Sequence, residues 1–177
     1  MAVVLAFAGS NSSVSINFKL INFTASLLKN HEVKAINLAH HPFPMYSYDE
    51  EKNNGYDKAL MRLKNDIETS DGILIAVNEH NGLPSAYFKN LIDWLSRIER
   101  KFLADKKIFL MASSGGKRGA ISALEVVENL LPRFGAEIIA TFSLPSFDEN
   151  FDEEKGIMHE ELATAHKKAL QLFLSKL

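Results

Sequence analysis

The chain has 177 residues, of which 46% are hydrophobic and 24% charged, and its formal net charge is −2 at pH 7. This is the balance of a soluble globular protein, and its interspersed charges leave no basic stripe for a nucleic-acid backbone. The absence of cysteine excludes disulfides and thiolate metal sites. No apolar run is long enough to cross a membrane, and no basic region precedes the apolar residues 1–4. We therefore expect a cytoplasmic protein without a signal peptide that binds neither nucleic acid nor membrane.

Short apolar runs alternate with amphipathic stretches along the whole chain. The runs have the length and composition of buried parallel strands, and in chain order they cover residues 2–8, 33–38, 72–77, 107–112 and 136–144. Apolar residues at helical spacing predict helices from Ile16 to Leu27, Tyr56 to Ile67, Tyr87 to Ile98, Ala120 to Leu131 and Met158 to Leu172. This alternation predicts an α/β three-layer sandwich with right-handed crossovers. No linker or repeat interrupts it, so we expect one domain over residues 1–177.

The helix from Tyr87 to Ile98 is apolar on two faces. One face carries Phe88 and Leu95, and the other carries Trp94 together with the two end residues. Two such faces are more than one sheet can bury. We therefore expect this helix to pack on the sheet and to contact another subunit.

Three segments that follow predicted strands carry residues that a hydrophobic core does not require. They are residues 9–15 after the first strand, 78–85 after the third and 113–119 after the fourth. Ligands of open parallel sheets gather at the carboxyl ends of the strands, near the point where the strand order reverses. Their joint placement predicts one ligand site at that edge.

The first of these segments, Gly9-Ser10-Asn11-Ser12-Ser13-Val14-Ser15, leads into a helix N-terminus. Its hydroxyl and amide groups, with the free backbone N–H groups of the helix, suit a monophosphate. It lacks both the three-glycine dinucleotide pattern and the lysine of a triphosphate-binding loop. In the simpler interpretation Ser13 or Ser15 only caps the helix, which explains one serine but not the set.

The other two segments have local explanations as well. In the middle segment, Asn81-Gly82 followed by Pro84 is common turn chemistry. In the third, the glycines at 115, 116 and 119 either allow backbone to approach a flat ligand or simply make a turn. His80 in the middle segment either stacks beside a ligand or is a partly exposed loop histidine. A metal pair at His40-His41 is not expected, because no third ligand accompanies it.

With these motifs the chain resembles the NAD(P)H-dependent FMN reductase family over essentially its whole length. The resemblance rests on Gly9-Ser10 with Ser15 and Asn17, on Glu79 and Asn81, on the run Lys89-Asn90-Leu91-Ile92-Asp93-Trp94, and on Ser113 with the glycines 115, 116 and 119. It implies a flavodoxin-like fold with strand order 2-1-3-4-5, non-covalent FMN and a homodimer or homotetramer. It also implies two-electron transfer from NADPH or NADH to a small-molecule acceptor such as a flavin, quinone or azo compound.

The resemblance also assigns residues to the cofactor. Those expected around the FMN phosphate are Ser10, Ser12, Ser15, Ile16 and Asn17. Those expected along the ring and ribityl chain are Asn78, Glu79, His80, Asn81 and Gly82, and those over the pyrimidine side are Ser113, Ser114, Gly115 and Gly116. This chain departs from the family where Ser12 replaces a frequent arginine, Asn78 a proline, His80 a tyrosine and Ser114 a proline.

No catalytic side chain is predicted, because a bound flavin itself accepts the hydride and the protein only orients and tunes it. Two alternatives stay open. One is a flavodoxin-type electron carrier that does not react with nicotinamide cofactors. The other is a binding or regulatory module without reductase activity.

Overall fold

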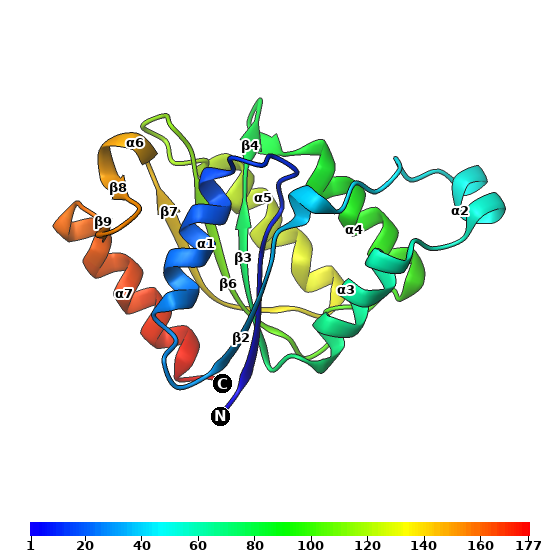
Figure 1. Cartoon of the computed structure of the whole chain (residues 1–177), viewed down its shortest axis with the longest axis horizontal. Coiled ribbons are helices and arrows are strands. Elements are labelled where there is room, and N and C mark those ends of the chain that lie inside the picture. The colour runs from blue at the N-terminus through cyan, green and yellow to red at the C-terminus, as the bar shows by residue number, and fades with distance from the viewer.

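Five parallel strands form the centre of the computed structural model, which describes residues 1–177 (Figure 1). They are β1 (Val3–Ala8), β2 (Glu32–Ile36), β3 (Gly72–Val77), β6 (Lys107–Ser113) and β7 (Glu137–Leu144). Their order in the sheet is β2-β1-β3-β6-β7, and every neighbouring pair is parallel. Counted over the five strands of this sheet, the order is 2-1-3-4-5, which confirms the prediction. The order reverses between β1 and β3, so a ligand is expected at the carboxyl ends of these strands.

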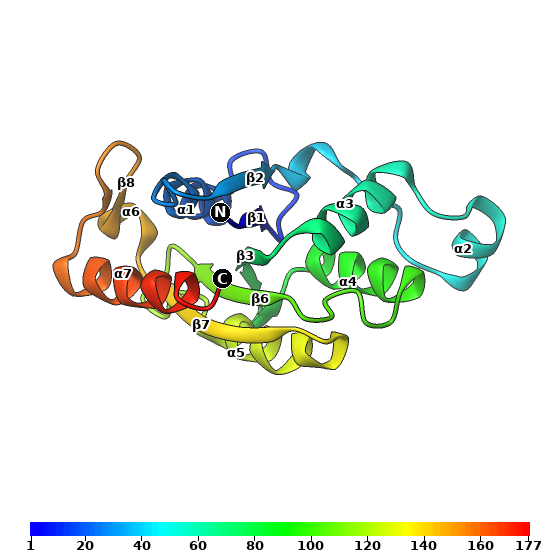
Figure 2. The ribbon, with the colours of Figure 1, turned by 90° about the horizontal axis from the view of Figure 1, so that it is seen from below.

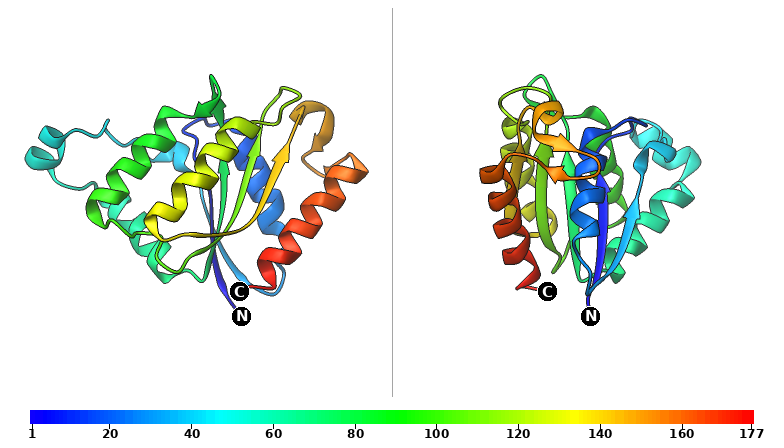
Figure 3. Two further views of the ribbon diagram at one scale, coloured as in Figure 1. Left: turned by 180° about the vertical axis from the view of Figure 1, so that it is seen from behind. Right: turned by 60° about the vertical axis from the view of Figure 1, so that its left-hand side comes forward.

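Helices cover both faces of the sheet, as the view from below shows (Figure 2). The helices α1 (Ile16–Ser26) and α7 (Glu160–Leu174) lie on one face, and α3 (Lys58–Thr69), α4 (Ala86–Ile98) and α5 (Ile121–Leu130) lie on the other (Figure 3). Alternate residues of β1 enter different cores: Leu5 and Phe7 face α3 and α4, whereas Val4 and Ala6 face α1. The predicted three-layer sandwich is therefore confirmed.

Several short elements are additions to the predicted pattern. They are α2 (Tyr48–Asn54), α6 (Phe147–Asn150), the hairpin of β4 (Glu79–His80) with β5 (Leu83–Pro84), the hairpin of β8 (Phe151–Asp152) with β9 (Gly156–Ile157), and two 3-10 turns over Leu38–His40 and Leu131–Phe134. Helix α2 buries none of its residues, so it has no apolar stripe by which the sequence could reveal it. No helix is long and apolar enough to span a membrane.

Residues 42–57, here called the arm, lie between β2 and α3 and carry α2 to one edge of the molecule (Figure 1). Two side chains of α4 hold the arm. The Asn90 side chain donates to the Pro44 carbonyl at 3.0 Å and accepts from the Tyr46 amide at 2.7 Å, and Trp94 Nε1 donates to the Pro44 carbonyl at 2.8 Å. The chain itself therefore covers the α4 face for which another subunit was expected.

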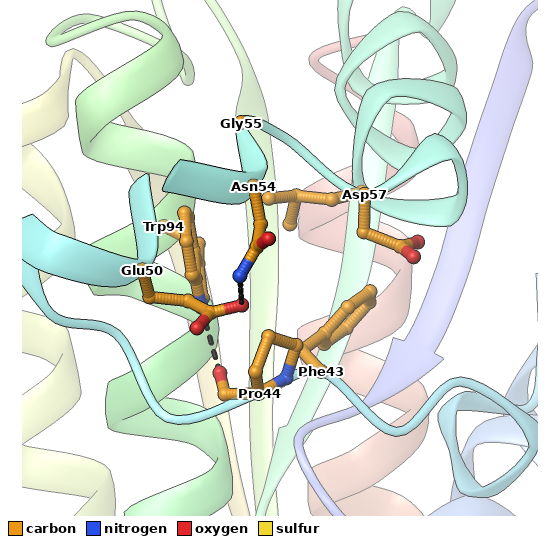
Figure 4. A pocket seen from close by; sticks show the side chains of 8 residues that line it. Phe43, Pro44, Glu50, Asn54, Gly55, Asp57 and Trp94 are labelled. Atoms are coloured by element: carbon orange, nitrogen blue, oxygen red, sulfur yellow. Dashed lines mark hydrogen bonds between the residues drawn. The ribbon is translucent and has the colours of Figure 1, made fainter. Parts of the chain in front are cut away.

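A carboxylate inside the arm strengthens this attachment. The Tyr56 hydroxyl donates to Glu51 at 2.7 Å, and Arg97 of α4 and the Tyr46 hydroxyl each donate to it at 3.0 Å. These bonds hold the pKa of Glu51 below its usual value. A small cavity of about 120 Å³ remains between arm and body, with Phe43, Pro44 and Trp94 on its apolar side (Figure 4).

His166 of α7 is buried, 2% exposed, between the sheet and α1. Its Nε2 lies 2.9 Å from the Thr24 hydroxyl, and the rings of Phe142, Phe109 and Phe23 surround it with centroids 5.0–5.8 Å away. Burial lowers the pKa of His166 to about 4, because the charged imidazolium would lose its hydration there.

This burial predicts a loss of stability on acidification. Between pH 6.5 and 4 the unfolded chain binds a proton at His166 that the native protein does not, so the free energy of unfolding should fall as pH falls. The loss attributable to this group should reach about 3 kcal/mol at pH 4 and be absent above pH 7. Urea unfolding from pH 7.5 to 4.5 measures it. His166→Gln, which cannot titrate, should flatten the profile, and an equally steep profile in that variant would contradict the assignment.

Candidate functional site

The three segments predicted to bind a ligand meet at the carboxyl ends of β1, β3 and β6, at the top of the sheet in Figure 1. They enclose an open pocket of about 340 Å³. Its lining is Ser10, Asn11, Ser12, Val14, Ser15, Ile16, Asn17, Asn78, Glu79, His80, Ser113, Ser114 and Gly115. The structure therefore brings together all the predicted site residues except Asn81, Gly82 and Gly116, which lie outside this lining. Asn11 and Val14 join it without having been predicted.

The N-terminus of α1 forms one wall of the pocket. The Ser15 hydroxyl accepts from the Phe18 amide at 3.2 Å, so Ser15 caps the helix. The backbone amides of Ile16 and Asn17 make no hydrogen bond within the protein, and the first turn carries no acidic residue. Two free amides at the positive end of a helix, with serine hydroxyls beside them, form a place for an anion.

The Asn17 side chain is hydrogen-bonded within the protein. It is 2% exposed, donates to the Ser113 carbonyl at 3.0 Å and accepts from the Ser113 amide at 2.8 Å. The Ser113 hydroxyl in turn donates to the Leu144 carbonyl at 2.9 Å. Asn17 thus ties the first segment to the third, and only its backbone amide is free to face a ligand.

The middle segment is a two-residue hairpin. Asn81 and Gly82 at its tip have φ of 54° and 77°, the left-handed pair of a tight hairpin turn. Below the tip, Asn78 Oδ1 is buried and has no hydrogen-bond partner, while Asn78 Nδ2 lies 3.2 Å from His80 Nε2. A buried acceptor without a partner is rare in folded proteins, and here it belongs to a pocket residue. It is suited to a ligand N–H or O–H.

Glu79 connects the middle segment to α5. The N-cap residue of helix α5 is Ala120, whose φ is 61° and whose side chain makes no capping hydrogen bond. The Glu79 carboxylate accepts from the Ala123 amide at 3.0 Å and so caps this helix from another element. The negative charge is also favourable at the positive end of the helix.

We expect Glu79→Ala to lower the free energy of unfolding by about 1–2 kcal/mol, the usual value of a lost cap. Glu79→Gln keeps an acceptor and should lose less than half of that. Thermal unfolding of the two variants checks the prediction. If both variants were as stable as the parent chain, Glu79 would not be the cap of α5.

Glycines shape the third segment for two different reasons. At Gly115 a Cβ atom would meet nothing within 4 Å, so the backbone there lies open to the pocket. Gly119 has φ of +60°, and a Cβ there would lie 2.3 Å from the Ser143 hydroxyl, so only glycine fits. Lys117 and Arg118 between them are exposed and outside the pocket lining. No group of three potential metal ligands forms at His40-His41 or elsewhere.

Comparisons with known proteins agree with this geometry. Residues 2–152 match the family described as NADPH-dependent FMN reductase. The quinone reductase of Escherichia coli K12 is 34% identical over 76 residues, which are 43% of this chain and 40% of that protein. The NADPH:quinone oxidoreductase of Arabidopsis thaliana is 30% identical over 123 residues, 67% of this chain and 61% of that protein. The chain thus spans less than two thirds of the length of these relatives.

Solved structures match over nearly the whole chain. The flavoenzyme NAD(P)H:(acceptor) oxidoreductase FerB from Paracoccus denitrificans superposes with a TM-score of 0.78 at 24% identity, covering 99% of this chain and 96% of that one. An NADH:FMN oxidoreductase in its apo form superposes with a TM-score of 0.79 at 17% identity, covering 99% and 90%. At such identities the likeness establishes the fold, and the match over residues 2–152 establishes the family. The chain therefore belongs to the NADPH-dependent FMN reductase family.

Proposed function

We propose that this protein is an FMN-dependent oxidoreductase that passes two electrons from NADPH or NADH to a small-molecule acceptor such as a flavin, quinone or azo compound. One observation carries the proposal: the free amides of Ile16 and Asn17 and the unpartnered Asn78 Oδ1 belong to residues of the same pocket. The two amides suit a phosphate, and the Asn78 oxygen suits a hydrogen-bond donor. FMN carries both groups, a phosphate at one end and a ring N–H at the other.

The binding residues would act in three groups. The amides of Ile16 and Asn17, with the hydroxyls of Ser10, Ser12 and Ser15, would hold the phosphate. Asn78, Glu79, His80, Asn81 and Gly82 would lie along the ring and ribityl chain, and Ser113, Ser114, Gly115 and Gly116 would lie over the pyrimidine side. Glu79 supports this arrangement indirectly, because its carboxylate caps α5. A single FMN-binding domain over residues 1–177 is part of the proposal.

The bound flavin would supply hydride acceptance, and no side chain of this protein is assigned a catalytic role. The protein's own contribution is placement: rigid strand ends hold three segments around one pocket, and the Asn17–Ser113 pair fixes two of them together. Because the pocket is open on one side, a nicotinamide and an acceptor would use the same exposed ring face in turn. A cytoplasmic location, where reduced nicotinamide cofactors are available, belongs to this proposal.

Absorption spectra of the purified protein with FMN, recorded before and after anaerobic addition of NADH and then NADPH, test the proposal. We expect flavin bands that bleach with one or both donors. Flavin bands that resist both donors would favour a flavodoxin-type electron carrier. A protein that shows no bound flavin after incubation with excess FMN would favour a binding or regulatory module.

We further propose a homodimer or homotetramer. Because the arm covers the outer face of α4, from Tyr87 to Ile98, the arm itself would supply the contact. Its Met45 and Tyr48 are 69% and 66% exposed, which is high for large apolar side chains. A second copy of this chain would bury them.

Sedimentation velocity at micromolar concentration should therefore show a species of at least twice the chain mass. The double substitution of Met45 and Tyr48 by glutamate should shift it toward monomer, because association would bury unpaired charge. Met158→Glu, at an exposed methionine on another part of the surface, serves as the control. A strict monomer for the parent chain would contradict this part of the proposal.

A further inference from the structure

Another cavity lies between α1 and α7. These two helices share one face of the sheet (Figure 2). Its volume is about 370 Å³, within the range of small-molecule sites. The walls are mainly apolar, with Phe23 from α1, Leu27 directly after α1, Ile157 from β9, and Leu170 from α7. None of its lining residues lines the pocket at the ends of the strands. The proposed FMN chemistry therefore leaves this cavity without a role.

One buried polar residue, His166, lines this cavity. The Thr24 hydroxyl donates to the Leu20 carbonyl at 2.9 Å, the usual bond of a threonine inside a helix. The same hydroxyl lies 2.9 Å from His166 Nε2, and it is assigned as the acceptor of that contact because its own single proton bonds the Leu20 carbonyl. The neutral ring therefore carries its proton on Nε2, and Nδ1 is left as an acceptor.

Nothing in the protein donates to this Nδ1. It takes part in none of the side-chain hydrogen bonds of the structure, and it is not among the buried atoms sealed from solvent. Because the ring lines the cavity and is otherwise enclosed by Phe23, Phe109 and Phe142, the free nitrogen is accessible from the cavity. An apolar cavity with a single acceptor matches an apolar molecule with a single O–H donor. A cationic ligand is disfavoured, because the positively charged Lys167 also lines the cavity.

We propose that the cavity between α1 and α7 binds a small phenolic compound. The aromatic ring would lie among Phe23, Ile157 and Leu170, and the phenolic O–H would donate to His166 Nδ1. Phenols fit better than aliphatic alcohols, because a flat ring packs against the Phe23 ring with little loss of conformational entropy. This site is separate from the FMN pocket, so the two ligands should bind at the same time.

The test uses phenol and anisole as probes on the full chain saturated with FMN. Anisole has the same ring but no O–H. Long-range ¹H–¹⁵N spectra of the histidine side chains report whether His166 Nδ1 accepts a hydrogen bond. We expect saturable binding of phenol with a shift of the Nδ1 resonance. Phenol should bind roughly fivefold to tenfold tighter than anisole, the factor contributed by one ordinary hydrogen bond.

Two matched variants on α7 locate the site. Ala163 lines the cavity and Ala165 faces solvent on the same helix. Ala163→Phe should fill the cavity and abolish phenol binding, whereas Ala165→Phe should leave it unchanged. Three results would each overturn the proposal. They are equal affinity for phenol and anisole, competition between phenol and FMN, and a dimer that forms without phenol and covers His166.

Discussion

Asn17→Ala is expected to lower both the stability of the protein and its affinity for FMN. The substitution removes two hydrogen bonds and leaves the buried amide and carbonyl of Ser113 without partners. Each such group costs about 1–3 kcal/mol, so the free energy of unfolding should fall by about 2–6 kcal/mol. Because the pair joins two of the three ligand-binding segments, the dissociation constant for FMN should rise roughly tenfold or more.

Chemical denaturation and FMN titration measure the two effects. Asn22→Ala is the matched control, because Asn22 is an exposed residue of the same helix and makes no side-chain hydrogen bond. Its stability and FMN affinity should match those of the parent chain. A loss of stability in Asn17→Ala with unchanged FMN affinity would mean that the third segment does not contact the cofactor.

The charge at position 12 is expected to control FMN affinity through the phosphate. Ser12 is exposed at the pocket edge, beside the N-terminus of α1, so its side chain can be exchanged without disturbing the core. Ser12→Arg should bind FMN roughly tenfold tighter, Ser12→Gln about as tightly as the parent chain, and Ser12→Glu roughly tenfold weaker. Raising the salt concentration should reduce the differences in FMN affinity among these variants, because exposed charges are screened.

Riboflavin provides the internal control for this series. It has the same ring but no phosphate, so its affinity should be nearly the same in all three variants. Fluorescence titration gives both sets of dissociation constants. If the three variants bound FMN equally, the phosphate would lie away from the N-terminus of α1. If riboflavin followed the same order as FMN, the substitutions would be acting on the ring rather than on the phosphate.

The fold could be predicted because its main strands and helices bury whole faces. Strand β3 is buried at every position and was predicted with its observed bounds, Gly72–Val77. The edge strand β2 has only one neighbour and is more exposed, and the predicted run 33–38 begins one residue late and ends two residues late. Helix α2 buries no residue and so has no apolar periodicity, and its sequence signals are limited to the Ser47 cap and the acidic first turn.

The outer face of α4 shows a limit of reasoning from periodicity. The two apolar faces predict packing on the sheet and contact with another subunit, and the structure shows the first of these. The second face is covered by the chain's own arm. The hydrogen bonds that hold the arm join residues separated by 44 to 50 positions in the sequence. Nothing in the local sequence around Pro44 distinguishes such a contact from one with another subunit.

The site was predictable in its location and less so in the roles of its residues. Segments after strands β1, β3 and β6 had to meet, because parallel strands end at one edge. Which polar group faces the pocket is decided by long-range partners. The Asn17 side chain is taken by Ser113, 96 positions away, and Glu79 by Ala123, 44 positions away. A single sequence carries no signal for either pairing.

We propose that three segments at the ends of β1, β3 and β6 form one FMN site. The most direct measurement is a fluorescence titration of the full chain with FMN and, in parallel, with riboflavin. We predict saturable binding of one FMN per chain, with riboflavin at least roughly tenfold weaker because the amides of Ile16 and Asn17 would lack their anion. Failure to bind FMN, or equal affinity for the two flavins, would contradict the account.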